Sequence, residues 1–330
     1  MNDKNIMRKH FQERFVNGGK ETEMSLIPPL PSSLNIELNS TCNHKCVFCP
    51  YHSDHATGGI GAHVMAYETA VRILDEAARL GIGKKEVGFY VCGEPFLYKK
   101  LPEVVAYAKK KGFAYTFLTS NGALATPERM KAVVDAGLDS IRFSVNAPTR
   151  ELYREIHGRD DSDQVYENIK YLAAYRRESR KNIAISLSCV LNKKTVGMQD
   201  MIRERFGELV DDIIFIPIII RPEMAETLAE YGFGNEADRV PRKGFVCKPV
   251  FNCLYIDAAC RVLACCEVYG EEEGVVYDLN EKLDLEAAWR SEEFQRYRKR
   301  FLEQEELRGT ICEHCYLATL NQDDGLFREG

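Results

Sequence analysis

Short apolar strands alternate with amphipathic helical segments over residues 35–220, and this alternation constrains the fold more than any other feature. Six apolar runs predict strands at 35–38, 86–91, 113–119, 140–145, 183–190 and 213–220. Between them, apolar residues recur at helical spacing near 66–80, 99–111, 127–136, 163–180 and 195–207. These units predict an α/β fold with a parallel sheet and right-handed crossovers, either an open doubly wound sheet or an incomplete barrel.

The alternation ends at Arg221-Pro222, and a different pattern follows. A cysteine-rich hairpin is predicted at 247–266 and a charged helix near 283–303, and Cys312-x2-Cys315 closes the region. We therefore predict a lead-in over residues 1–34, a main domain over 35–222 and a small metal-supported domain over 223–330. Ligands of parallel sheets bind at the carboxyl ends of the strands, so the loops after the strands are expected to carry function.

Composition and charge argue against several classes of protein. The 330 residues carry a net charge of −6, which argues against a general binder of nucleic acid or of anionic membranes. Residues 1–20 hold no apolar core of signal-peptide length, and no apolar run reaches the roughly 18 residues of a membrane span. A cytoplasmic protein is the expectation. In a reducing compartment its 12 cysteines indicate metal or redox chemistry rather than disulfides.

Three cysteines form a tight set directly after the first predicted strand. Cys42, Cys46 and Cys49 have the spacing C-x3-C-x2-C, with an aromatic residue before the last of them. Three thiolates on one loop can hold three irons of a [4Fe–4S] cluster and leave the fourth iron open to a substrate or cofactor. The alternative is a zinc site completed by His44 or His52, although zinc usually takes its four ligands from two separated pairs.

Three further motifs stand at strand ends, in order along the chain. They are Cys92-Gly93-Glu94-Pro95 after the second predicted strand, Thr119-Ser120-Asn121-Gly122 after the third and Ser144-Val145-Asn146 at the end of the fourth. Each motif alone is an ordinary turn. Together with the cysteine loop they make the chain resemble the radical S-adenosylmethionine (SAM) enzymes over residues 35–220. The resemblance implies a partial (β/α)6 barrel.

The resemblance also implies roles for single residues. Cys42, Cys46 and Cys49 would ligate the cluster, and the amino and carboxylate groups of SAM would chelate its open iron. Reductive cleavage of SAM would give methionine and a 5′-deoxyadenosyl radical that abstracts hydrogen from the substrate. The expected SAM contacts are Phe48 for the adenine, Gly93 and Glu94 for the amino group, Ser144 with the neighbouring Asn146 for the methionine or ribose portion, and Arg159 or Arg154 for the carboxylate.

Two thiols near these motifs have alternative roles. Cys92 stands where the family usually has a glycine, so it is either a small buried residue or a reactive thiol near SAM. Cys189 ends the fifth predicted strand. It is either packed in the core or faces the barrel mouth, where it would return a hydrogen atom to a substrate radical.

A second cysteine set lies in the C-terminal region. Cys247, Cys265, Cys312 and Cys315 resemble the four-cysteine auxiliary-cluster module called Twitch, the shortened relative of the SPASM domain. Four thiolates would saturate one [4Fe–4S] cluster, and a four-cysteine zinc site is the alternative. The hairpin turn of this module usually ends in glycine, where this chain has Cys260. The spare thiols, expected to be packed or near the cluster, are Cys253, Cys260 and Cys266.

Two outcomes follow from a substrate radical. An electron accepted by a saturated auxiliary cluster gives net oxidation, whereas a hydrogen atom from a thiol gives epimerisation. The clearer auxiliary ligand set favours oxidation of a sugar, aminocyclitol, nucleoside or other small metabolite, with an external electron donor such as flavodoxin or ferredoxin.

Two other functions remain as alternatives. Modification of a ribosomal peptide comes second, because about 34 residues before the first strand are too few for a leader-binding domain. A non-catalytic iron–sulfur electron carrier comes third, since the missing fourth cysteine of the loop and the Gly93-Glu94 motif argue against it.

Overall fold

The structure is a computed structural model that describes the larger part of the chain. The described residues are Lys9, 23–54, 56, 61–220, 224–233, 240–265, 274–308, 310, 312–313 and 315–319. Most of the predicted lead-in, the predicted domain boundary after residue 222, and Cys266 lie outside the described residues.

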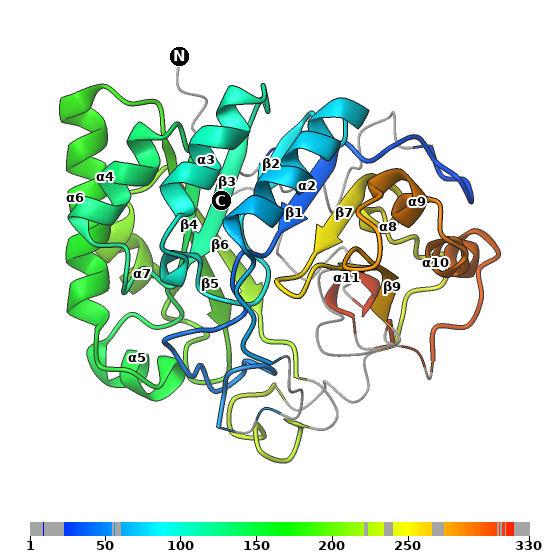
Figure 1. Ribbon diagram of the computed structural model, residues 1–330. Helices are drawn as coiled ribbons and strands as arrows, with labels where there is room; N and C mark the ends of the chain where they lie inside the picture. Colours follow the sequence, from blue (N-terminus) through cyan, green and yellow to red (C-terminus); the bar gives the residue numbers. More distant parts are fainter. Residues whose placement is uncertain are drawn as a thin grey trace.

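One sheet of nine strands runs through the molecule, in the order β6-β5-β4-β3-β2-β1-β7-β8-β9 (Figure 1). The first six strands pair in parallel, each beside its sequence neighbour. β7 joins the other side of β1 in parallel, and β8 and β9 follow antiparallel. The strands are β1 (Ser33–Ile36), β2 (Glu86–Gly88), β3 (Thr116–Ser120), β4 (Ser140–Ser144), β5 (Ala184–Leu191), β6 (Asp212–Pro217), β7 (Cys253–Ile256), β8 (Arg261–Leu263) and β9 (Val275–Asp278).

Helices cover the outer face of the six parallel strands, and a second group of helices gathers at the β7 end (Figure 1). The first group is α2 (Tyr67–Leu80), the 3-10 turn η1 (Pro95–Leu97), α3 (Leu101–Lys110), α4 (Pro127–Asp135), α5 (Arg150–His157), α6 (Ser162–Ser179) and α7 (Gln199–Phe206). The second is α8 (Pro249–Asn252), α9 (Leu285–Trp289), α10 (Glu292–Leu302) and α11 (Tyr316–Thr319). None of the described helices combines the length and the apolar composition that crossing a membrane requires.

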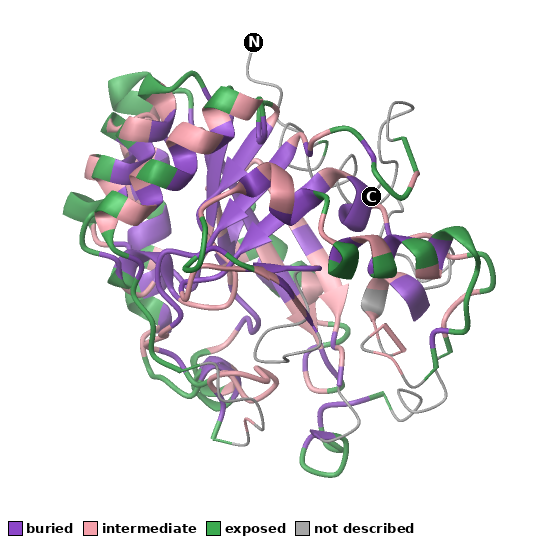
Figure 2. Ribbon diagram, turned by 45° about the vertical axis from the view of Figure 1, so that its right-hand side comes forward, coloured by how far each residue is buried: buried purple, intermediate pink, exposed green. Residues whose placement is uncertain are grey.

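The predicted α/β fold is confirmed as an open partial barrel, because six parallel strands alternate with helices. Every strand and helix predicted between residues 35 and 220 overlaps an observed one, and β7 with β8 forms the predicted hairpin. Figure 2 shows buried strands inside and exposed faces on the outer helices. The sheet continues from β1 into β7, so residues assigned by sequence to two domains build one sheet.

Two details of the helices differ from expectation. The single helix predicted over 283–303 is two helices, α9 and α10. Ser291 separates them, because its hydroxyl accepts from Phe294 N and caps a new helix start. α5 was not predicted, since half of its eight residues are charged and it buries only Tyr153, Ile156 and His157.

A buried arginine ties the C-terminal helices to one another and to the segment before β1. Arg298 of α10 has no exposed surface, and its guanidinium lies 4.1 Å from the ring centroid of Trp289. It donates to the carbonyl oxygens of Val250, Leu26 and Trp289 at 3.2, 3.0 and 2.8 Å. One cation therefore ties α8, α9 and the segment before β1 together.

Candidate active site

A cavity of about 490 Å³ opens at the carboxyl ends of the parallel strands. All three cysteines of the 42–49 loop line it, and so does Phe48. Other lining residues come from the three strand-end motifs: Gly93, Glu94, Ser120, Asn121, Ser144 and Asn146. The structure thus brings together every residue predicted to bind the first cluster and all predicted SAM contacts except Arg159.

The cysteine loop is held by the C-terminal end of α5. The backbone N–H groups of Lys45 and Val47 donate to the carbonyl oxygens of His157 and Ile156, at 3.2 and 2.9 Å. Gly158 ends the helix with φ of 66°, and a Cβ there would lie 2.9 Å from the carbonyl oxygen of Lys45. Glycine allows this close approach in a left-handed conformation. The loop therefore rests on a helix end that sequence patterns did not reveal.

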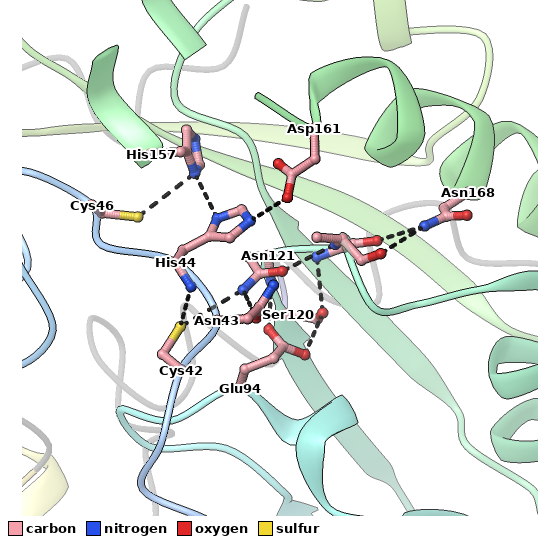
Figure 3. Close-up of polar contacts among 12 residues, drawn as sticks. Cys42, Asn43, His44, Cys46, Glu94, Ser120, Asn121, His157, Asp161 and Asn168 are labelled. Carbon is pink, nitrogen blue, oxygen red and sulfur yellow. Dashed lines mark hydrogen bonds and ion pairs between the residues drawn. The ribbon is translucent and has the colours of Figure 1, made fainter. Parts of the chain in front are cut away.

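Each sulfur of the loop faces a nitrogen atom of another side chain. The pairs are Cys42 with Asn121 Nδ2 at 3.7 Å, Cys46 with His157 Nδ1 at 3.6 Å, and Cys49 with His52 Nδ1 at 3.6 Å. The first two pairs are visible in Figure 3. Hydrogen bonds of this kind favour the charged form of sulfur, which is the form that binds iron.

Burial sets the protonation of these thiols in the metal-free chain. It raises the pKa of Cys42 to about 11, and it raises the pKa of Cys46 well above its usual value. Burial acts on Cys49 in the same direction, but the hydrogen bond with His52 and backbone hydrogen bonds outweigh it, so the pKa of Cys49 is lowered. Burial therefore favours the protonated form of Cys42 and Cys46 in the metal-free chain, and metal binding must displace these protons.

Two buried histidines connect Cys46 to Asp161 (Figure 3). His44 Nε2 lies 3.1 Å from Asp161 Oδ2, and His44 Nδ1 lies 3.4 Å from His157 Nδ1. Burial lowers the pKa of His157 to about 3, so its ring is neutral. His44, Cys46 and His157 offer donor atoms within 4.8 Å of one another. Both nitrogens of His157 are nevertheless engaged, because Nε2 accepts from Asn146 N at 3.1 Å.

The Gly93-Glu94 turn is fastened to the base of the cysteine loop. Glu94 N donates to the carbonyl oxygen of Thr41 at 2.8 Å, and Asn39 Nδ2 donates to that of Glu94 at 3.0 Å. A Cβ at Gly93 would lie 2.0 Å from the carbonyl oxygen of Asn39, so only glycine fits there. The loops after β1 and β2 therefore form one unit.

Glu94 is only 2% exposed, and its carboxylate reaches the turn after β3 (Figure 3). Oε1 accepts from Ser120 Oγ at 2.8 Å and from Phe96 N at 3.0 Å, and Oε2 accepts from Asn121 N at 2.9 Å. Burial raises the pKa of Glu94. A carboxylate offers about four acceptor positions, so one position on Oε2 stays open for a cationic ligand group.

Ser144 and Asn146 line the cavity where β4 ends. Ser144 Oγ lies 3.5 Å from Ser188 Oγ of β5. Asn146 Oδ1 accepts from Val190 N at 2.8 Å. The two residues thus link the ends of β4 and β5, and Asn146 also links them to His157 through its backbone.

Arg159 and Cys189 do not reach the cavity. Arg159 and its alternative Arg154 are exposed, and neither is among the residues that line it. Cys189 is 1% exposed in the hydrophobic core, whereas Ser188 and Val190 on either side line the cavity. Side chains alternate along a strand, so Cys189 points away from the cavity. This placement argues against Cys189 as a hydrogen donor and agrees with the alternative of a packed core cysteine.

Cys92 lines the cavity and is held by Glu37, a residue that sequence analysis missed. Glu37 Oε1 accepts from Cys92 N and Sγ, both at 2.9 Å, and from Gly93 N at 3.1 Å. Its Oε2 accepts from Ala258 N, 221 positions away, at 3.1 Å. Burial and the charge of Glu37 raise the pKa of Cys92, which keeps the thiol protonated. Short spacing patterns cannot reveal a partner so distant in sequence.

The C-terminal cysteines come from separate segments. Burial raises the pKa of Cys247, and the charges of Cys315 and Cys312 raise it further, so these two thiols lie within electrostatic range of Cys247. Cys253, predicted as a spare thiol, adds to the same effect. Cys265 follows β8 and packs against the barrel-facing side chains of β7 and β8.

The β7–β8 hairpin forms although Cys260 occupies the position of the family's glycine. Cys260 has φ of 64°, the left-handed conformation that glycine prefers, and its N–H donates to the carbonyl oxygen of Asp257 at 2.9 Å. The turn geometry is therefore kept despite the substitution.

Residues 36–187 match the model of the radical SAM superfamily. These residues form a radical SAM domain. The chain is 26% identical over 226 residues to the tungsten-containing aldehyde ferredoxin oxidoreductase cofactor-modifying protein of Pyrococcus furiosus. The matched region covers 68% of this chain and 61% of that protein. The chain is 31% identical over 137 residues to a probable GTP 3′,8-cyclase of Saccharolobus islandicus, 42% of each chain. The chain thus spans less than two thirds of the length of either relative.

Solved structures of radical SAM proteins share the fold. Streptococcus suis SuiB bound to S-adenosylmethionine matches with a TM-score of 0.62 and 15% identity over 90% of this chain and 74% of that one. BtrN in complex with AdoMet and 2-DOIA matches with a TM-score of 0.52 and 16% identity over 91% of this chain and 96% of that one. The superfamily is one of enzymes that use a [4Fe–4S] cluster and SAM, so the chain is an enzyme rather than a non-catalytic electron carrier.

Proposed function

We propose that this enzyme uses radical SAM chemistry to oxidise a sugar, aminocyclitol, nucleoside or other small metabolite. The observation that carries the proposal is the convergence of Cys42, Cys46, Cys49 and Glu94 on one cavity at the strand ends. When bound there, a [4Fe–4S] cluster and SAM supply an electron and a 5′-deoxyadenosyl radical that abstracts hydrogen.

Three protein sulfurs are available to the cluster, and the two histidines that could add a fourth ligand are occupied. His44 Nε2 faces Asp161, and its Nδ1 faces His157. His52 Nε2 lies 2.8 Å from the carbonyl oxygen of Ser40, and its Nδ1 faces Cys49. This arrangement supports a cluster with one open iron and argues against zinc.

The residues around the sulfurs suit SAM. The open acceptor position on Glu94 Oε2 can bind the amino group. Gly93 lets the turn pack against the backbone of Asn39, which holds Glu94 in place. Phe48 lines the cavity beside the last cysteine, where it can pack against the adenine. Ser144 presents a hydroxyl for the methionine or ribose portion.

The cavity wall supports a hydroxylated small molecule as substrate. Tyr90, Thr119, Ser144 and Ser188 line it, and their hydroxyl groups can donate to and accept from a sugar-like ligand. The match to BtrN covers 96% of that chain, whereas SuiB bound to the precursor peptide SuiA is matched over 67% of its length. We therefore place a peptide substrate second.

The second cysteine set provides the electron acceptor for the oxidation in this proposal. We propose that Cys247, Cys265, Cys312 and Cys315 hold an auxiliary [4Fe–4S] cluster. Removal of one hydrogen atom leaves a substrate radical, which completes a two-electron oxidation when one electron passes to this cluster and one proton to solvent. Zinc accepts no electron, so a zinc site would not serve. Cys265 and Cys92 of the cavity wall both pack against one buried cluster formed by Cys253, Tyr255 and Leu263, which supports electron transfer between the sites.

The first test is the formation of 5′-deoxyadenosine. The anaerobically reconstituted protein is reduced with dithionite or with a flavodoxin or ferredoxin, the external donor class we propose, and incubated with SAM. Release of 5′-deoxyadenosine that rises with candidate sugars, aminocyclitols or nucleosides is expected. Absence of 5′-deoxyadenosine from iron-replete protein would contradict the proposal.

A second assay separates oxidation from epimerisation. The active substrate is converted in deuterated water. A product lighter by two hydrogens is expected. Solvent deuterium retained in an otherwise unchanged product would instead show hydrogen return from a thiol. Cys92 lines the cavity for that role, whereas Cys189 does not.

A further inference from the structure

His157 contacts both halves of the candidate active site. Its Nε2 accepts from the backbone N–H of Asn146, at the end of β4, at 3.1 Å. Its Nδ1 lies 3.6 Å from Cys46 Sγ of the cysteine loop. The side chain has no exposed surface, and its ring stacks on Tyr153 with centroids 4.0 Å apart. The ring is therefore fixed in place between a strand end and one cluster sulfur.

The backbone of Asn146 also fixes the tautomer of His157. An N–H group can only donate, so the Nε2 atom that receives it carries no hydrogen. The neutral ring must then carry its hydrogen on Nδ1, the atom that faces Cys46. His157 thus presents a permanent donor to this sulfur without gaining a proton.

A second acceptor competes for this hydrogen. His44 Nε2 faces a carboxylate oxygen of Asp161 at 3.1 Å and donates to it. His44 Nδ1 lies 3.4 Å from His157 Nδ1, which already carries a hydrogen, so His44 Nδ1 is the acceptor of this pair. The Nδ1 hydrogen of His157 is consequently shared between Cys46 Sγ and His44 Nδ1.

The side chains that contact the sulfurs of Cys49 and Cys42 differ from His157 in their hydrogen bonding. His52 donates from Nε2 to the carbonyl oxygen of Ser40 at 2.8 Å, so its Nδ1 can donate to Cys49 only when the ring carries a second proton. Asn121 Nδ2 contacts Cys42 at 3.7 Å but also donates to Asn43 Oδ1 at 2.9 Å. Of these three side chains, only His157 is a neutral ring whose donor is fixed by the backbone.

We propose that His157 is a positioning residue that raises the reduction potential of the cluster held by Cys46, and that His44 moderates this effect by sharing the hydrogen. The inference rests on the proposed cluster at Cys42, Cys46 and Cys49. A hydrogen bond to a ligand sulfur stabilises the reduced cluster, which carries one more negative charge, and so favours its reduction. The external donor then reduces the cluster more readily, and the reduced cluster supplies the electron for SAM cleavage.

The proposal predicts shifts of opposite sign for two neighbouring histidines. His157→Leu removes the donor and should lower the reduced-to-oxidised ratio of the cluster at a fixed potential by about tenfold, which corresponds to about 59 mV for one electron. His44→Leu removes the competing acceptor and should raise the ratio. His157→Asn places an amide N–H group near the former Nδ1 and should restore part of the wild-type value.

The measurement is a redox titration of the holoenzyme followed by electron paramagnetic resonance. The signal that changes on addition of SAM identifies the relevant cluster, and iron content is matched between variants. Unchanged potentials, or shifts of the same sign in His157→Leu and His44→Leu, would overturn the inference. If no signal of the wild-type protein changes on addition of SAM, the proposed function is overturned instead.

A second measurement covers the case in which His157→Leu fails to fold. Pulsed electron paramagnetic resonance of the reduced holoenzyme, labelled with 15N-histidine, should detect a histidine nitrogen and an exchangeable hydrogen near the cluster. His52 Nδ1 also lies 3.6 Å from a ligand sulfur, so its own nitrogen coupling is expected in every variant. The couplings of His157 should persist in His44→Leu. In His157→Asn the nitrogen coupling of His157 should be lost, and only the hydrogen of the new amide should replace its exchangeable hydrogen. A histidine coupling that is lost in His44→Leu, or no loss of a histidine coupling in His157→Asn, would contradict the assignment.

Discussion

The two cysteine sets differ in how the chain brings their sulfurs together. Cys42, Cys46 and Cys49 lie on one loop, line a cavity and face side-chain nitrogen atoms of Asn121, His157 and His52. The C-terminal set is gathered from distant segments, and Cys247 is buried beside Cys312 and Cys315. The first arrangement leaves room for a ligand at a cavity, whereas the proposed ligands of the second are thiols alone. This difference underlies our proposal that SAM binds at the first site and that the second accepts an electron.

Loss of one sulfur from the first site should have the largest effect. Cys46→Ala is expected to abolish 5′-deoxyadenosine formation, a loss of more than about a hundredfold, because the cluster loses one of its three protein ligands. Iron at the second site should remain. The measurements are chromatography of the nucleoside and iron analysis. SAM cleavage at the wild-type rate in Cys46→Ala would remove the distinction between the sites.

Loss of the second site should separate SAM cleavage from product formation. The double variant Cys312→Ala/Cys315→Ala is expected to lose about half of the iron and to retain 5′-deoxyadenosine formation, while oxidised product falls by about a hundredfold. Metal analysis and product assays check this. Zinc in place of iron in the wild type, or undiminished oxidation by the variant, would contradict an electron-accepting cluster.

The carboxylate of the first site should control SAM affinity. Glu94→Gln removes a charged acceptor and should weaken SAM binding by about tenfold to a hundredfold. Burial raises the pKa of Glu94, and a carboxyl gains its proton as pH falls through that pKa. Wild-type affinity should therefore decline toward acid pH, and this decline should be absent from Glu94→Gln. Equal pH profiles for both proteins would argue against Glu94 as the amino-group ligand.

The second site should depend on the packing of its separate segments. Arg298→Met leaves the carbonyl oxygens of Val250, Leu26 and Trp289 without their shared donor and should cost about 3 kcal/mol of stability. Urea unfolding measures the loss. A chelator should then remove iron from the second site faster, with the SAM-responsive cluster unaffected. Arg298→Lys, which keeps the charge without the planar fork, is the matched control.

The smallest effect is expected at a thiol that serves neither site. Cys189→Ala should cost about 1 kcal/mol, because a small buried side chain is removed from the core. SAM cleavage and product formation should stay at wild-type levels. A selective loss of product formation would restore Cys189 as a hydrogen donor.

Sequence patterns sufficed where the relevant residues lie close together in the chain. Strand and helix periodicity predicted the parallel sheet, and the spacing of the cysteine loop and its strand-end motifs predicted residues that the structure brings to one cavity. Arg159 failed to reach that cavity, since its selection rested on charge alone.

The supporting contacts could not be predicted in the same way. Glu37 binds Cys92 and Ala258, and His157 meets Cys46 from 111 positions away. Such pairs depend on the tertiary fold. The only local signal was Gly158, which could mark the end of a helix and so point to α5.

The most direct test of the two-site account is electron paramagnetic resonance of the reduced wild-type holoenzyme with and without SAM. Two cluster signals are expected. SAM should change the one that is lost in Cys46→Ala and leave unchanged the one that is lost in Cys312→Ala/Cys315→Ala. A spectrum in which SAM alters both signals, or neither, would contradict the assignment of an open first site and a closed second one.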